Sequence, residues 1–146
     1  NGLAVGIGAT VLLHCDLVLL AASARLRFPF TALGIVPEAG SSALLPARAP
    51  WGDAAWALLS SEWIDAEAAR RLGVAWRVVA DERLEPEVQT VAATLAALDR
   101  ASVTATKRLL VAGREDVVAS AMARELDAMA MLTAAHRPDR PLGEEV

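Results

Sequence analysis

The residue best placed to do chemistry is Glu38, which follows Pro37 in the middle of a mostly apolar stretch. A carboxylate can act as a general base, and a single one can take a proton from one carbon and return it to another. Apolar neighbours would exclude water from this carboxylate; they are Phe28, Phe30, Leu33 and Ile35. The alternative is structural, because an acid just after a proline favours the first turn of a helix.

A second candidate is the backbone of the opening segment, which reads NGLAVGIG. Glycines let the main chain approach a ligand closely and present its N–H groups. Such donors stabilise negative charge that develops on a carbonyl oxygen. The alternative is a glycine-rich turn that packs against a helix and contacts no ligand. A dinucleotide-binding fingerprint is not indicated, because Gly6-Ile7-Gly8 lacks the third glycine.

The other residues with reactive side chains are less informative. His14 and Cys15 are adjacent, without further cysteines or histidines at metal-ligand spacing, so we expect no metal site. Ser41 and Ser42 have no histidine near them in the sequence to act as a base, so hydrogen bonding at a helix start is the expected role.

The order of the segments closely resembles the crotonase superfamily, the enoyl-CoA hydratase/isomerase fold. The matching segments are NGLAVGIG, Cys15-Asp16, Phe28-Pro29-Phe30 and the run LGIVPEAGSS from Leu33 to Ser42. The resemblance covers almost the whole chain but only the later part of the family's domain, which implies that the N-terminal part is absent from this sequence. It implies an α/β fold, with the C-terminal part of a ββα spiral core over residues 1–80 and a helical trimerisation region over residues 81–146.

The resemblance also implies roles for particular residues. In enoyl-CoA isomerases of the family, a glutamate at the position of Glu38 is the catalytic base, whereas hydratases usually carry glycine there. The chain therefore looks most similar to the Δ3-Δ2-enoyl-CoA isomerases, which move a 3-enoyl-CoA double bond to the 2-position. The backbone N–H of Ile7 would be one oxyanion donor, and the other would belong to the missing N-terminal part. The residues expected to bind substrate are Gly6, Gly8, Phe30, Leu33 and Lys107.

Lys107 enters this set because crotonases often carry a Thr-Lys pair on a C-terminal helix, here Thr106-Lys107. Its amine would reach a CoA phosphate, sometimes from a neighbouring subunit. The alternative is a solvated surface lysine.

Hydratases of the family use two glutamates that position and activate water. Thr10 stands at the place of the first of these and Phe30 at the place of the second. Neither side chain can serve as a general base at neutral pH, so the resemblance argues against hydratase activity.

Two rival functions remain open at this point. One is another acyl-CoA reaction that uses the same oxyanion hole. The other is a non-catalytic acyl-CoA-binding protein that keeps the assembly but not the chemistry. In either case CoA belongs to the ligand, and no metal or separate cofactor is expected. The family further implies self-association as a trimer or a hexamer.

The composition of the 146 residues suits a packed globular domain, with 55% hydrophobic and 22% charged residues. A net charge of −4 implies no surface for nucleic acid. Cys15 is the single cysteine, which fits a reducing compartment, and no targeting segment is visible, so we expect a cytoplasmic protein. Asp16 interrupts the apolar stretch from Leu3 to Leu20, so no membrane span is expected.

The elements that must position these residues follow from periodicity and end signals. The first half is expected to hold short strands and helix starts: a buried helix over residues 11–13, strands over 17–20, 25–28 and 74–79, and a helix start at Pro37-Glu38. Later helices are expected to begin at Asp53, Asp65 and Ser102, and Gly73 and Gly113 to end two of them. Two apolar stripes predict further helices, one through Leu84, Val88, Val91, Leu95 and Leu98, the other through Val118, Met122, Leu126 and Met129.

Overall fold

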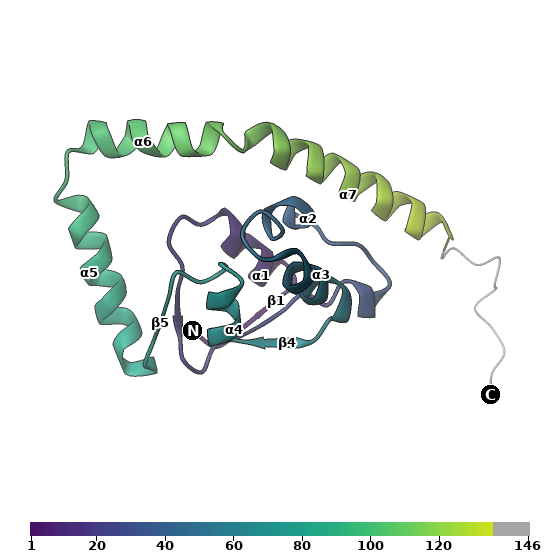
Figure 1. The fold of residues 1–146 in the computed structure, drawn as a ribbon, viewed down its shortest axis with the longest axis horizontal. Helices are drawn as coiled ribbons and strands as arrows, with labels where there is room; N and C mark the ends of the chain where they lie inside the picture. The colour runs from purple at the N-terminus through teal and green to yellow at the C-terminus, as the bar shows by residue number, and fades with distance from the viewer. Residues whose placement is uncertain (136–146) are drawn as a thin grey trace.

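The centre of the fold is a small sheet of three strands, seen in a computed structural model that describes residues 1–135 (Figure 1). The strands are β1 (Leu3–Val5), β3 (Arg25–Arg27) and β4 (Trp63–Asp65), with β3 in the middle. β1 runs parallel to β3, and β4 runs antiparallel to it. Successive strand residues point to opposite faces. Leu26 is therefore fully buried, while Arg25 and Arg27 lie over the ring of Trp63 on the other face, at 5.9 and 5.6 Å.

A second sheet joins two segments that are far apart in the sequence. β2 (Leu19–Ala21) pairs in parallel with β5 (Arg77–Val79), with Leu20 opposite Val78. Parallel neighbours need a long crossover connection. Here β3, β4 and the helices between the two strands form that crossover.

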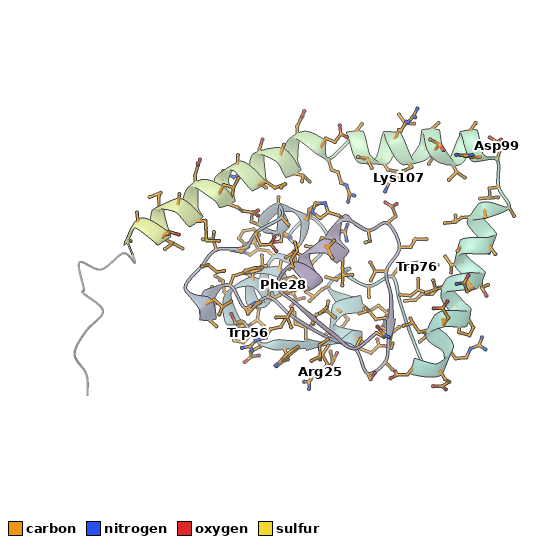
Figure 2. All side chains as sticks on the ribbon, turned by 180° about the vertical axis from the view of Figure 1, so that it is seen from behind. Arg25, Phe28, Trp56, Trp76, Asp99 and Lys107 are labelled. Carbon is orange, nitrogen blue, oxygen red and sulfur yellow. The ribbon has the colours of Figure 1, made fainter. Side chains whose placement is uncertain are left out.

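Short helices surround the two sheets and close the core. They are α1 (Ile7–Thr10), η1 (Val11–His14), η2 (Thr31–Leu33), α2 (Ser41–Leu44), α3 (Trp51–Ser60) and α4 (Ala66–Arg71), the η elements being 3₁₀ helices. Phe28 is the largest fully buried side chain and lies near the middle of this region (Figure 2). It belongs to one apolar cluster that includes Leu13, Leu26, Leu45, Ala54 and Val74.

The C-terminal arm, which we define as residues 84–135, consists of three helices. A 3₁₀ turn at η3 (Asp81–Arg83) leads into α5 (Leu84–Ala96), which is followed by α6 (Arg100–Ala112) and α7 (Glu115–Ala135). Figure 1 shows these helices as an arch around one side of the core, with α7 running along α2. The apolar side of α5 faces β2 across an open groove, which is lined by residues such as Leu12, Leu19, Val88 and Val91.

Several expected elements are confirmed. The strand at 25–28 is β3, and the strands at 17–20 and 74–79 are present as the shorter β2 and β5. Asp65 caps α4, since its Oδ1 accepts a hydrogen bond of 2.7 Å from the N–H of Ala68. Gly73 follows the end of this helix with φ +68, a left-handed conformation suited to glycine.

Three expected helix starts are wrong in position. The helix predicted at Pro37-Glu38 begins only at Ser41, because Ala39 and Gly40 both have positive φ and form a turn first. Asp53 lies inside the first turn of α3 rather than capping it. The cap of α6 is Asp99, whose carboxylate accepts from the N–H of Ser102 at 2.8 Å.

The stripe predicted for the last helix is also wrong in part. The helix exists as α7, but Leu126 is 69% exposed, and the buried residues are Ala121 and Glu125. The final residues of the region predicted as helical, 136–146, lie outside the described part of the chain. Within residues 1–135, no helix has the length and apolar character needed to cross a membrane.

Candidate active site around Glu38

Glu38 lies in the loop between η2 and α2, and its carboxylate is held by Thr10. The hydroxyl of Thr10 donates a hydrogen bond of 2.6 Å to Oε1 of Glu38. Thr10 is fully buried, so its hydroxyl is fixed by packing. A carboxylate that accepts a bond from a fixed donor has a defined orientation, which a general base requires. Local sequence patterns do not predict this contact, since the two residues are 28 positions apart.

The helix that carries Thr10 also presents the expected oxyanion donor. Ile7 is the first residue of α1, and the first N–H groups of a helix have no acceptor within the helix. Thr10 lies three residues further on, which is a rise of about 4.5 Å along the axis. The Glu38 carboxylate is therefore tied to the same helical turn that begins with the N–H of Ile7.

The two glycines beside Ile7 leave this turn open. Gly6 has φ +57, which glycine adopts far more readily than other residues. A Cβ atom added at Gly6 or at Gly8 would meet no atom within 4 Å. The backbone is thus accessible on this side, as expected for a main chain that a ligand approaches closely.

The loop after Glu38 is anchored on the side of η1. Ala39 has φ +57, which is uncommon for a residue with a Cβ atom. Its carbonyl oxygen lies 2.7 Å from Nε2 of His14. The carbonyl oxygen of Glu38 accepts from the N–H of Ser41 at 3.1 Å and from its hydroxyl at 2.7 Å. These bonds hold the backbone that carries the carboxylate.

The other anchor comes from α7 and was missed by sequence reasoning. Glu125 is 7% exposed, and Oε2 of its carboxylate accepts from the N–H of Gly40 at 2.7 Å. Its Oε1 accepts from the N–H and the hydroxyl of Ser42, at 3.0 and 2.5 Å. A glutamate on an amphipathic helix is normally assigned to the solvent side, so periodicity alone gave no reason to place it here.

The stretch of η1 that contributes His14 is itself held by two arginines. Arg48 donates to the carbonyl oxygen of Leu13, and Arg114 contacts the carbonyl oxygens of Leu13 and His14 at 3.5 and 3.3 Å. Burial, followed by the like charge of Arg114, lowers the pKa of Arg48. Arg114 lies between α6 and α7, so the arm is joined to the core at η1 as well as at the loop after Glu38.

The residues expected to bind substrate have different environments. Leu33 is 65% exposed, so its side chain is available to a ligand. Phe30 is only 3% exposed and packs within the core, a position that favours a structural role over direct contact. Lys107 points from α6 toward the core, where its amine forms an ion pair with Asp16 (Figure 2). A phosphate group would therefore compete with Asp16 for this amine.

The apolar surroundings expected for Glu38 are present only in part, because Phe28 and Phe30 are buried in the core while Leu33 is mostly exposed. In the described part of the chain, no group of three or more histidine, cysteine or acidic side chains is placed to hold a metal ion.

A known protein family matches almost the whole chain. The family model described as enoyl-CoA hydratase/isomerase matches residues 1–140. The chain belongs to the enoyl-CoA hydratase/isomerase family. The α/β core followed by a helical C-terminal region is thus the crotonase fold expected from the resemblance.

Some relatives in this family are named hydratases and others isomerases. A probable enoyl-CoA hydratase of Rhodobacter capsulatus is 35% identical over 125 residues, which are 86% of this chain and 49% of the relative. A 1,2-epoxyphenylacetyl-CoA isomerase of Escherichia coli is 40% identical over 96 residues, which are 66% of this chain and 37% of the relative. Membership of the family therefore does not by itself separate hydration from isomerisation.

A solved structure extends the likeness to the whole described fold. An enoyl-CoA hydratase/isomerase from Pseudoalteromonas atlantica superposes with a TM-score of 0.87 at 40% identity, covering 93% of this chain and 55% of that chain. The chain spans about half the length, or less, of the curated relatives it matches.

Proposed function

We propose that this chain carries the catalytic base of an enoyl-CoA isomerase, which converts a 3-enoyl-CoA to the conjugated 2-enoyl-CoA. One observation carries the proposal: the hydrogen bond from the Thr10 hydroxyl to Glu38 joins the carboxylate to the helical turn that begins at Ile7. An acid that merely favoured a helix start would lie on the first turn of α2, whereas Glu38 precedes α2 and contacts α1 instead.

The reaction needs one base and one oxyanion donor. Glu38 removes a proton from C2, and the electron pair of that C–H bond moves into the acyl group, so that negative charge develops on the thioester oxygen. The N–H of Ile7 stabilises this charge. The same carboxylate then returns the proton at C4, and the double bond ends between C2 and C3. Proton transfer by a positioned base typically contributes about 10²–10⁴-fold.

Hydration is disfavoured by the two positions that carry the hydratase glutamates. Thr10 has no acidic group, and its hydroxyl is already engaged with Glu38. Phe30 is buried in the core. Only Glu38 remains to activate water, so we expect hydration of crotonyl-CoA to be very slow or undetectable. Rapid loss of the conjugated enoyl absorbance with the whole protein would contradict this.

The decisive variant is Glu38→Gln, which keeps the size of the side chain and removes the base. Isomerisation of a 3-enoyl-CoA by the whole protein should fall by about 10²–10⁴-fold, while the melting temperature changes little. Glu62→Gln is the matched control, because it makes the same change at an exposed carboxylate in the core region. Wild-type turnover by Glu38→Gln would end the assignment. A protein that binds acyl-CoA but has no turnover before mutation would support the non-catalytic alternative.

The proposal extends to the assembly. Large apolar side chains are exposed along the arm: Leu98, Leu109, Leu110, Leu126 and Met131. Exposed apolar surface of this kind marks sites of protein contact. We propose that the whole protein associates as a trimer or a hexamer and that part of the arm is covered by other subunits. A sedimentation mass equal to one subunit at micromolar concentration would refute this.

A further inference from the structure

Glu125 is the buried carboxylate on α7 that contacts the loop carrying Glu38. We propose that Glu125 is a positioning residue for the catalytic base, holding the backbone after Glu38 while Thr10 holds the carboxylate itself. The inference rests on the proposed function of Glu38, and it assigns to the C-terminal helix a part in catalysis beyond packing.

The contacts of Glu125 are directed at the loop alone. Its carboxylate accepts three hydrogen bonds, from the N–H of Gly40 and from the N–H and hydroxyl of Ser42. An ionised carboxylate only accepts hydrogen bonds, and all three partners here donate. Both oxygens are used, which fixes the side chain in position and direction. A residue that served only to pack α7 would need none of these bonds.

The position of Glu125 on its helix supports the same reading. In α7 the buried residues are Ala121 and Glu125. Burying a carboxylate is costly unless it is well hydrogen-bonded, and an apolar residue at such a site often serves stability equally well. The stability of the helix therefore does not explain the glutamate, whereas the donors of the loop do.

The backbone between the two glutamates makes the coupling direct. Gly40 has φ +71, and a Cβ added there would lie 3.1 Å from Cγ1 of Val118, so α7 touches the loop backbone closely. Gly40 is two residues from Glu38, and Ala39 between them is also left-handed. Thr10 holds one carboxylate oxygen of Glu38, but the Cα position of Glu38 depends on this turn. Release of Gly40 and Ser42 would let the carboxylate shift while the rest of the core stays in place.

The test is Glu125→Gln in the whole protein. One glutamine oxygen can still accept from Ser42, but the amide nitrogen would face the N–H of Gly40, so one donor loses its acceptor. A displacement of about 1 Å in a catalytic group can cost about 10²-fold in rate. We expect kcat to fall by about 10- to 100-fold with little change in KM. Asp127→Asn is the matched control, because it makes the same change on an exposed side chain of the same helix.

A double variant separates positioning from a general loss of structure. If Glu125 acts through Glu38, then adding Glu125→Gln to Glu38→Gln should lower the residual rate no further. An equal additional loss in the Glu38→Gln background would show that Glu125 supports the whole fold, and the inference would be wrong. Unchanged kcat in Glu125→Gln, with Glu38→Gln inactive, would refute the inference and leave the proposed function intact. Full activity of Glu38→Gln would instead refute the proposed function.

Ser42→Ala covers the case in which Glu125→Gln does not fold. It removes one of the three donors from an exposed residue and leaves both backbone N–H bonds. We expect a folded protein with a smaller loss of kcat in the same direction and the same absence of additivity with Glu38→Gln. Wild-type kcat in a folded Ser42→Ala, together with an unfolded Glu125→Gln, would count against positioning and for a structural role.

Discussion

The core and the C-terminal arm use their side chains in opposite ways. Between Ala9 and Ala75 the chain buries a continuous apolar cluster, with Leu13, Leu26 and Phe28 fully covered. In the arm, α5 and α6 contain no buried residue, and α7 buries Ala121 and Glu125. The core therefore depends on extensive apolar burial, whereas the arm contacts it through a few apolar residues, such as Val118 and Ala121, and through the directed polar bonds of Glu125 and Arg114.

The largest expected effect is on stability, and it is seen by truncating one apolar side chain in the core and one in the arm. Phe28→Ala should lower the free energy of unfolding by about 3–5 kcal/mol, because it removes a fully buried ring and leaves a cavity. Leu109→Ala, at a residue that is 77% exposed, should leave the unfolding of the isolated subunit within about 0.5 kcal/mol. Denaturant titration measures both.

Protein concentration sharpens this contrast. If Leu109 acts through association, its variant should change the melting temperature only at concentrations where subunits assemble. Phe28→Ala should have the same effect at every concentration. A concentration-independent loss in Leu109→Ala would show that α6 belongs to the core.

The second prediction concerns the point where the two regions meet. Gly40→Ala should destabilise the protein by about 1–2 kcal/mol, because the left-handed backbone disfavours a Cβ atom and the new atom would press on Val118. Gly52→Ala is the control, since a Cβ there meets nothing within 4 Å and the residue lies inside α3. Gly52→Ala should be neutral or stabilising by up to about 1 kcal/mol. Equal melting temperatures of the two variants would contradict the close approach of α7.

The third prediction compares two helix caps of the same chemistry. Asp65 caps α4 in the core, and Asp99 caps α6 in the arm, with bonds of 2.7 and 2.8 Å. Asp65→Ala should cost about 0.5–2 kcal/mol of global stability. Asp99→Ala should instead speed amide hydrogen exchange within α6 and barely change global unfolding, because α6 buries no side chain in the core. The reverse pattern would mean that the arm unfolds together with the core.

The smallest effect is a pH dependence at the junction. Hydrogen bonds from the hydroxyl and the N–H of Ser23 lower the pKa of Asp81, which precedes α5. A lowered pKa means that this contribution to stability is complete above the unfolded value of about 3.9 and is lost as pH falls through the folded value. The difference in melting temperature between wild type and Asp81→Asn should therefore be constant above about pH 4 and shrink below it. Glu82→Gln controls for the change of charge, and a difference that grows on acidification would contradict the assignment.

The same contrast explains how far the sequence predicts the fold. Local sequence signals in the core predicted a helix end correctly where a single residue determines it, as with Asp65 before α4 and Gly73 after it. The local signals failed at Pro37-Glu38. Ala39 there has a positive φ, so the helix begins further along the chain, and an alanine in the sequence does not predict a positive φ. The helix cap at Asp99 was missed because Ser102, three residues later, gives an equally good local signal.

The candidate site shows more clearly what local sequence patterns do not predict. Glu38 was identifiable from its motif, but its partner Thr10 was read only as a missing hydratase acid. Glu125 was invisible to periodicity, which predicted Leu126 as a buried residue of the stripe. Contacts between residues 28 or 85 positions apart depend on tertiary packing, which local sequence patterns do not encode.

The distance along the chain between Gly40 and Glu125, 85 residues, has a consequence for how the protein is made. The ribosome releases the loop long before the helix that braces it, and domains fold progressively from the N-terminal side during synthesis. The strand pair β2–β5 can already form once Val79 has emerged. The turn after Glu38 receives its brace only when α7 arrives. A nascent chain that stopped before Glu125 would lack the acceptor of the Gly40 and Ser42 hydrogen bonds, so the turn after Glu38 is completed only when this part of α7 has been made.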